Sequence, residues 1–63
     1  MIDFTYANHG SIVTLTPLTP RANEWVAEHL PDDAQTFGPS IVIEPRYFDD
    51  IAEGILADGL SLE

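Results

Sequence analysis

The side chains of this chain that could do chemistry are mostly carboxylates. Eleven acidic residues stand against two basic ones in 63 residues, and the formal net charge is −9. Several of the acids fall within or beside two stretches with helical patterning, which makes them the candidate partner-binding residues. They are Glu24, Glu28, Asp32, Asp33, Asp49, Asp50 and Glu53.

Acid–base catalysis is one chemistry that grouped carboxylates could perform. It needs burial or a pocket that separates the pKa values of the pair. Asp49, Asp50 and Glu53 fall instead on the polar side of an amphipathic pattern. The two aspartates also follow a helix start, where negative charge is favourable by about 0.3–1 kcal/mol, so a solvated helix start is the alternative. The chain has no glycine-rich phosphate loop and no nucleophile elbow. We therefore expect no enzyme and no catalytic residue.

Metal binding is the other chemistry to consider. Glu28, His29, Asp32 and Asp33 offer oxygen and nitrogen ligands, but their spacing matches no known metal-binding loop. His9, in a turn, could be a catalytic base, but it has no Ser, Cys or carboxylate partner at useful spacing. The chain has no cysteine, which excludes disulfides and thiolate metal sites. We expect neither a metal nor a cofactor.

The charge as a whole exceeds what a fold requires. Glu24 and Glu28 are like charges four residues apart, as are Asp49 and Glu53, and each such pair costs about 0.2–0.5 kcal/mol on a helix. Solubility alone needs a net charge of only about 2–8 in magnitude. Helical carboxylates at this spacing lie about 5–6 Å apart, in rows that resemble duplex phosphates. Such a surface predicts attraction to Lys/Arg grooves and repulsion of nucleic acid itself.

A hairpin and a third strand are predicted to carry the sheet. Apolar residues alternate over Ile2–Tyr6 and again over Ser11–Thr16, with turn chemistry at Asn8–Gly10 between them. Ile41–Ile43 is the third strand, and its continuous apolar run favours a central position. Phe37–Pro39, just before it, is interpreted as a breaker.

Two helices are predicted to position the acids. Thr19 caps the first, Pro20 opens it and Pro31 stops it. Trp25 lies in the middle of its apolar face, and we expect it in the core. Pro45 opens the second helix, and Gly59 is a C′ glycine with Leu60 as its hydrophobic contact. The predicted inner face of the second helix consists of Phe48, Ile51, Ala52, Ile55 and Leu56.

The predicted fold class is α+β, in one small acidic domain over residues 1–63. The element order β-β-α-β-α predicts a two-layer sandwich, a three-stranded sheet with both helices on one face. The preferred strand order is 2-1-3, with 1-2-3 as the alternative. The uncovered sheet face must then be polar or meet a partner. Leu62 and Glu63 are also a common ending before a purification tag, so these two residues belong either to the domain or to such a tag.

We expect neither a membrane segment nor a signal peptide in this chain. No stretch approaches the roughly 18–20 apolar residues of a membrane span, and the N-terminus MIDFTYANHG lacks a basic region and a long apolar run. We therefore expect a cytoplasmic protein that does not bind membranes.

The stretch IVIEPRYFDDIAEGILADGL, preceded by LTPLTPRANEWVAEHL, resembles a family of very short acidic proteins encoded in proteobacterial genomes, phages and plasmids. They share a V-E-P/H-R-Y segment and end in D-G-L. The resemblance covers Thr14 to Leu60, with Ile43 in place of valine and Ile2–Tyr6 as an extension. In size and charge the chain is also similar to type I anti-CRISPR proteins, several of which are DNA mimics that bind the Cascade surveillance complex.

Two functions are consistent with these observations. The first is a non-catalytic acidic inhibitor that occupies the nucleic-acid-binding surface of a basic protein or complex, with Cascade as the candidate that the likeness implies. The alternative is an accessory or antitoxin-like interaction module that uses an exposed sheet face or an edge strand. The chain is expected not to bind nucleic acid directly, and to be a monomer or a weak homodimer.

Overall fold

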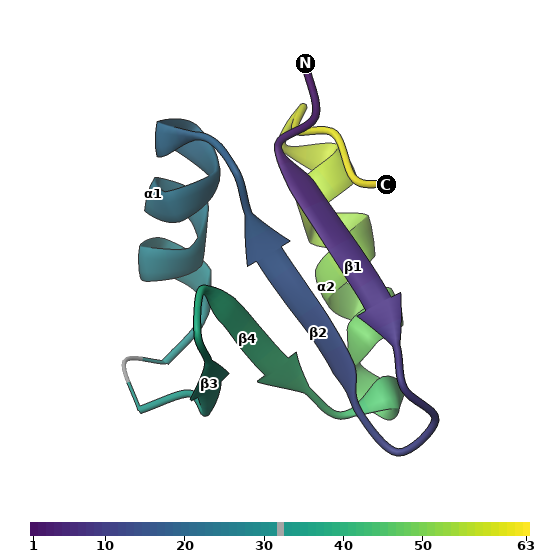
Figure 1. Cartoon of the computed structure of the whole chain (residues 1–63). Coiled ribbons are helices and arrows are strands. Elements are labelled where there is room, and N and C mark those ends of the chain that lie inside the picture. The colour runs from purple at the N-terminus through teal and green to yellow at the C-terminus, as the bar shows by residue number, and fades with distance from the viewer. Residues whose placement is uncertain (32) are drawn as a thin grey trace.

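Six elements follow one another in the order β-β-α-β-β-α (Figure 1). They belong to a computed structural model that describes residues 1–31 and 33–63. The strands form one antiparallel sheet, and the class is α+β as predicted. The elements are β1 (Phe4–Asn8), β2 (Val13–Pro17), α1 (Pro20–His29), β3 (Thr36–Phe37), β4 (Ser40–Ile43) and α2 (Pro45–Ala57).

The predicted N-terminal hairpin is confirmed. β1 and β2 pair antiparallel, and Asn8 opposite Val13 is their last pair before the loop. The Asn8 Oδ1 atom accepts a hydrogen bond from the Gly10 backbone N–H at 2.8 Å, and Gly10 takes a φ of 89°. These are the turn functions that an Asn and a Gly perform best.

The sheet has four strands in the order β1-β2-β4-β3, so the prediction of three strands is wrong. β3 pairs antiparallel with β4 through Thr36 opposite Ile41 and Phe37 opposite Ser40. The segment interpreted as a breaker is the turn of this hairpin, with Gly38 at a φ of 62°. The preferred order 2-1-3 is also wrong, because β2 lies between β1 and β4, as in the alternative order.

Both helices begin and end where the sequence predicts. The Thr19 Oγ1 atom accepts a hydrogen bond from the Ala22 N–H at 3.2 Å, which caps α1. At the end of α2, Gly59 has a φ of 82°, and its N–H donates to the Leu56 carbonyl at 3.1 Å. The Leu60 N–H donates to the Ile55 carbonyl, also at 3.1 Å. This pair of bonds is a Schellman motif, and it satisfies carbonyls that the helix end leaves free.

The core lies between the sheet and the two helices, which cover the same side of the sheet (Figure 1). Trp25 is buried, as predicted. Leu56 was predicted to face inward but is 58% exposed, because it lies about 100° around the helix from its buried neighbour Ile55. The opposite side of the sheet has no helix over it among the described residues. The buried core residues are Phe4, Leu15, Ala22, Trp25, Ile41, Ile43, Ile55 and Leu60.

The last three residues pair with the outer edge of β1. The Phe4 N–H donates to the Ser61 carbonyl at 3.0 Å, the Glu63 N–H to the Phe4 carbonyl at 3.0 Å, and the Tyr6 N–H to the Glu63 carbonyl at 3.1 Å. Residues 61–63 therefore occupy the edge that β1 would otherwise present. Neither described helix combines the length and apolar character needed to cross a bilayer.

Candidate functional site

The predicted partner-binding acids lie on the helices and on the loop that follows α1. Glu24 and Glu28 are exposed on α1, and Asp33 is exposed in the loop. The other exposed acids of the predicted set lie on α2; they are Asp49, Asp50 and Glu53. Asp32 lies outside the described residues. The acids thus fall into two groups, one on each helix.

The group on α1 includes an acid that the sequence analysis did not assign to a site. Glu24 and Glu28 line a hollow between α1 and the end of α2, and so do Arg21 and Asp58, the residue that follows α2. Asp58 also accepts a hydrogen bond from the Trp25 indole N–H at 2.7 Å. Its helix-end position is unfavourable for an anion, but this bond from a core side chain explains its presence there.

His29 lies in the same hollow. Its ring stacks on the Trp25 ring with the centroids 4.2 Å apart, and its Nδ1 atom lies 2.9 Å from the Trp25 carbonyl oxygen. Its Nε2 atom is 3.6 Å from the Asp58 carboxylate. His29 therefore covers Trp25 from the solvent side, which is a packing role.

Both arginines of the chain are engaged by carboxylates outside the predicted set. Arg21 contacts Asp3 at 2.7 Å, and Arg46 contacts Glu44 at 2.8 Å. Arg46 also lies over the Tyr47 ring, 4.8 Å from its centroid. Within residues 1–31 and 33–63, none of the predicted acids forms an ion pair with a cation. Their carboxylates therefore face solvent without an ion pair, although Arg21 lines the same hollow as Glu24 and Glu28.

Asp3 differs from every other described acid because it is buried. Its carboxylate accepts hydrogen bonds from the Arg21 guanidinium at 2.7 and 2.9 Å, from the Thr19 hydroxyl at 2.7 Å and from the Ser61 N–H at 3.0 Å. The bond from Arg21, followed by those from Ser61 and Thr19, holds the pKa of Asp3 well below its ordinary value, against the opposing effect of burial. The network joins β1, the start of α1 and residue 61. It is a structural centre, and the sequence analysis missed it because Asp3 occupies an ordinary polar position of an alternating pattern.

The four strands have a different chemistry from the helices. No charged residue occurs in the described strands. The side of the sheet away from the helices presents hydroxyls and apolar side chains, and Thr16 and Ser40 contact each other across β2 and β4 at 2.7 Å. The molecule therefore has an acidic helical side and an uncharged sheet side.

No family model matches the chain, and neither a curated protein nor a solved structure does. The resemblance to short acidic phage and plasmid proteins, and the likeness to anti-CRISPR proteins, accordingly remain predictions.

Proposed function

We propose that this protein is a non-catalytic acidic inhibitor that occupies a nucleic-acid-binding surface of a basic partner. The observation that carries the proposal is that both arginines pair with carboxylates outside the candidate set. Asp3 and Glu44 engage them, and the candidate acids of α1 and α2 form no ion pair among the described residues, so their negative charge is available to a partner. The partner proposed is a type I Cascade complex, on the basis of the likeness in size and charge to anti-CRISPR proteins.

The inhibitor would act by electrostatic attraction followed by steric exclusion. Uncompensated carboxylates on two rigid helices are attracted to Lys and Arg side chains that otherwise contact phosphates. Carboxylates three or four residues apart on a helix lie about 5–6 Å apart, close to the spacing of phosphates along a strand. Binding in that groove would exclude the nucleic acid without a chemical step. Attraction of this kind accelerates association and weakens as salt rises.

Neutralising the α2 group tests this mechanism. The D49N/D50N/E53Q variant keeps the side-chain shapes and removes three charges. We expect it to displace target DNA from purified Cascade about 10- to 100-fold less effectively than the parent. Its stability should stay within about 1 kcal/mol of the parent, because relief of like-charge repulsion offsets the lost helix-start interaction. The measurement is displacement of fluorescent target DNA at low and high salt, with a thermal melt of each protein.

The charge-preserving variant D49E/D50E/E53D is the matched control, and it should inhibit nearly as well as the parent. The pair E24Q/E28Q reports in the same assay whether the α1 group takes part. Equal inhibition by the parent and D49N/D50N/E53Q, with the same salt dependence, would assign the α2 acids to solvated surface. No displacement by the parent at about 100 μM, roughly four orders of magnitude above a tight complex, would remove Cascade as the partner.

Direct binding to nucleic acid should be absent. With a net charge of −9 and both arginines engaged, the protein has no cationic surface with which to release counterions from phosphates. A gel shift with random duplex DNA and with RNA at physiological salt, without divalent ions, should show no complex. A shifted band at micromolar protein would contradict the charge argument.

The interaction-module alternative draws support from the uncharged sheet side. Pairing through an edge strand has less support, because residues 61–63 occupy the edge of β1 and the opposite edge strand, β3, has only two residues. An interaction module built on this fold would therefore use the face of the sheet.

A further inference from the structure

A hollow with apolar walls lies against β4, between the segment that follows α1 and the start of α2. Its volume is about 290 Å³. Leu30 and Ala34 line it from the segment after α1, and Tyr47 and Ile51 line it from α2. Every lining side chain except that of Glu44 is apolar or aromatic. We name this feature the Tyr47 hollow.

Two candidate acids flank the Tyr47 hollow. Asp33 adjoins the lining residue Ala34, and Asp50 adjoins the lining residue Ile51. Both acids are exposed, and among the described residues neither pairs with a cation. The apolar walls therefore lie between unpaired carboxylates that belong to different elements.

The margin of the hollow already holds a guanidinium. Arg46 lies over the Tyr47 ring, 4.8 Å from its centroid, and its Nε atom donates to the Glu44 carboxylate at 2.8 Å. Glu44 and Tyr47 both line the hollow. A ring face beside a carboxylate is a favourable setting for a cation. Because the pair of Arg46 and Glu44 is exposed and such pairs are weak, a cation from a partner can replace Arg46.

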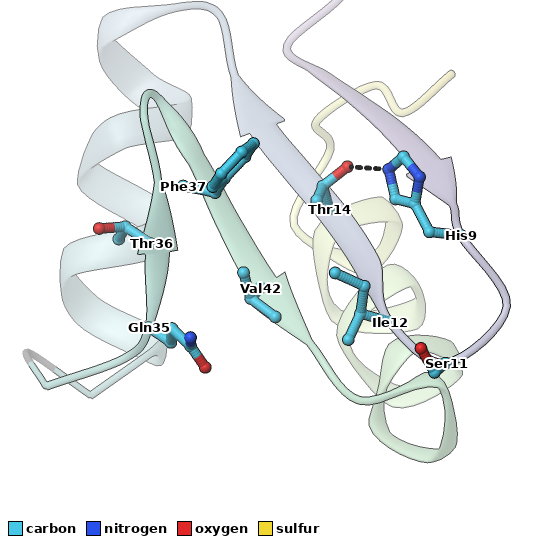
Figure 2. Close-up of a pocket in the computed structure, with 8 residues that line it drawn as sticks. All are labelled: His9, Ser11, Ile12, Thr14, Gln35, Thr36, Phe37 and Val42. Atoms are coloured by element: carbon cyan, nitrogen blue, oxygen red, sulfur yellow. Dashed lines mark hydrogen bonds between the residues drawn. The ribbon is translucent and has the colours of Figure 1, made fainter.

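Charge alone does not supply the affinity of a tight complex. Electrostatic attraction mainly raises the association rate, whereas affinity depends on a few anchors buried in pockets. The hollow at Glu24 and Glu28 is lined mostly by polar side chains. The hollow beside Phe37, on the other side of the sheet, has no acid in its lining (Figure 2). The Tyr47 hollow has both apolar walls and flanking acids.

We propose that the Tyr47 hollow receives an apolar side chain of the basic partner, presented between arginine or lysine residues. The apolar side chain packs against Ala34 and Ile51, and the flanking cations pair with Asp33 and Asp50. The two surfaces are complementary because acids flank the apolar walls as cations flank the apolar side chain. This inference rests on the proposed inhibitor role, since it describes how the same partner is held.

Two synthetic peptides test the proposal on the full chain. Both consist of arginine and lysine residues, and they differ at one central position, which is Phe in one peptide and Ser in the other. We expect the Phe peptide to bind about tenfold more tightly, because burial of its ring is favourable. Higher salt should weaken both complexes and leave their ratio unchanged, since screening acts on the charges and not on the apolar contact. The measurement is an NMR titration, in which the Phe peptide should shift the methyl signals of Leu30, Ala34 and Ile51.

Tyr47→Ala removes one wall of the hollow and the ring on which Arg46 lies. We expect it to lower the preference for the Phe peptide to about twofold or less. Because Tyr47 is 51% exposed, the variant should keep the fold, which a thermal melt checks. The matched control is L56A, which removes an apolar side chain that is 58% exposed on α2 and outside the hollow. It should leave the preference unchanged.

Equal affinity of the parent for the two peptides would overturn the proposal. Methyl shifts confined to the hollow beside Phe37, or a preference that is lost in L56A and kept in Tyr47→Ala, would overturn it as well. Displacement of DNA from Cascade tests the inhibitor role separately. If the Phe peptide binds in the Tyr47 hollow but the parent displaces no DNA, the hollow keeps its occupant and Cascade is removed as the partner. If Tyr47→Ala displaces DNA as well as the parent does, the inhibitor role stands and the hollow is not its anchor.

Discussion

Replacing Trp25 with alanine is expected to unfold the protein. Trp25 is only 6% exposed, and its ring meets the Phe4 ring edge-on with centroids 6.0 Å apart. α2 approaches the same ring so closely that a Cβ atom at Gly54 would lie 3.3 Å from it. Truncation of a buried Trp costs about 3–5 kcal/mol, and a core of this size supplies about the same amount in total. Circular dichroism at 25 °C should show the loss of helix and of a cooperative melt.

Trp25→Phe separates burial of the ring from the hydrogen bond to Asp58. It keeps an aromatic ring in the core and loses the indole N–H that donates to Asp58 at 2.7 Å. We expect it to fold and to lose about 1–3 kcal/mol of unfolding free energy. If Trp25→Ala melts within a few degrees of the parent, α1 does not contribute to the core as the structure indicates.

Replacing Asp3 with asparagine is expected to have the second-largest effect on stability. The amide keeps one accepting oxygen and replaces the other with an NH2 group. Because Arg21 donates to both carboxylate oxygens, this NH2 would face an Arg21 donor in either orientation. It would also leave Arg21 without its counter-charge. Loss of one partner from such a network is far more costly than loss of an exposed charge. At pH 7 the melting temperature should fall by on the order of 10 °C or more.

Asp33→Asn is the matched control for Asp3→Asn. It makes the same chemical change at an acid that is exposed in the loop after α1. Its melting temperature should stay within a few degrees of the parent, because surface substitutions usually change stability by less than about 0.5 kcal/mol. An equal effect of the two substitutions would show that Asp3 contributes only its share of the net charge.

The effect of Asp3 should depend on pH in a defined direction. Its pKa is lowered on folding from 3.8 by the hydrogen bonds from Arg21, Ser61 and Thr19. A carboxyl group whose pKa is lower in the folded state contributes its full stabilisation at pH values above its unfolded-state pKa. This stabilisation is lost as the pH falls toward its folded-state pKa. The melting-temperature difference between the parent and Asp3→Asn should therefore be constant from pH 7 to pH 5 and shrink below about pH 4. A difference that grows below pH 4 would contradict this assignment.

The number and direction of the strands show where local patterns were insufficient. β3 has only two residues, and the segment after it has the composition of a turn. β3 is a strand only because it pairs with β4. Each element runs opposite to the one before it (Figure 1). Omitting β3 therefore places β4 directly after α1 and makes it parallel to β2. With β3 present, β4 is antiparallel to β2.

The candidate site, like the sheet, could be predicted only in part from local patterns. The exposure of Glu24, Glu28, Asp49, Asp50 and Glu53 agrees with their helical spacing, because one helix face follows from a period of 3.6 residues. That both arginines are engaged elsewhere could not be predicted. Arg21 meets Asp3 across 18 residues of sequence, and no local pattern encodes that contact.

The sequence by itself determined the fold class, the hairpin loop and the ends of both helices. The signals there, at Asn8, Gly10, Thr19 and Gly59, act through hydrogen bonds between residues no more than five apart. Only the tertiary structure decided the strand order, the burial of Asp3 and the uncharged face beside Phe37. Those features depend on which distant segments meet, as when Ser61 donates to Asp3 from 58 residues away. Contacts at such separations are set by the packing of the whole core, in which each pairing excludes others.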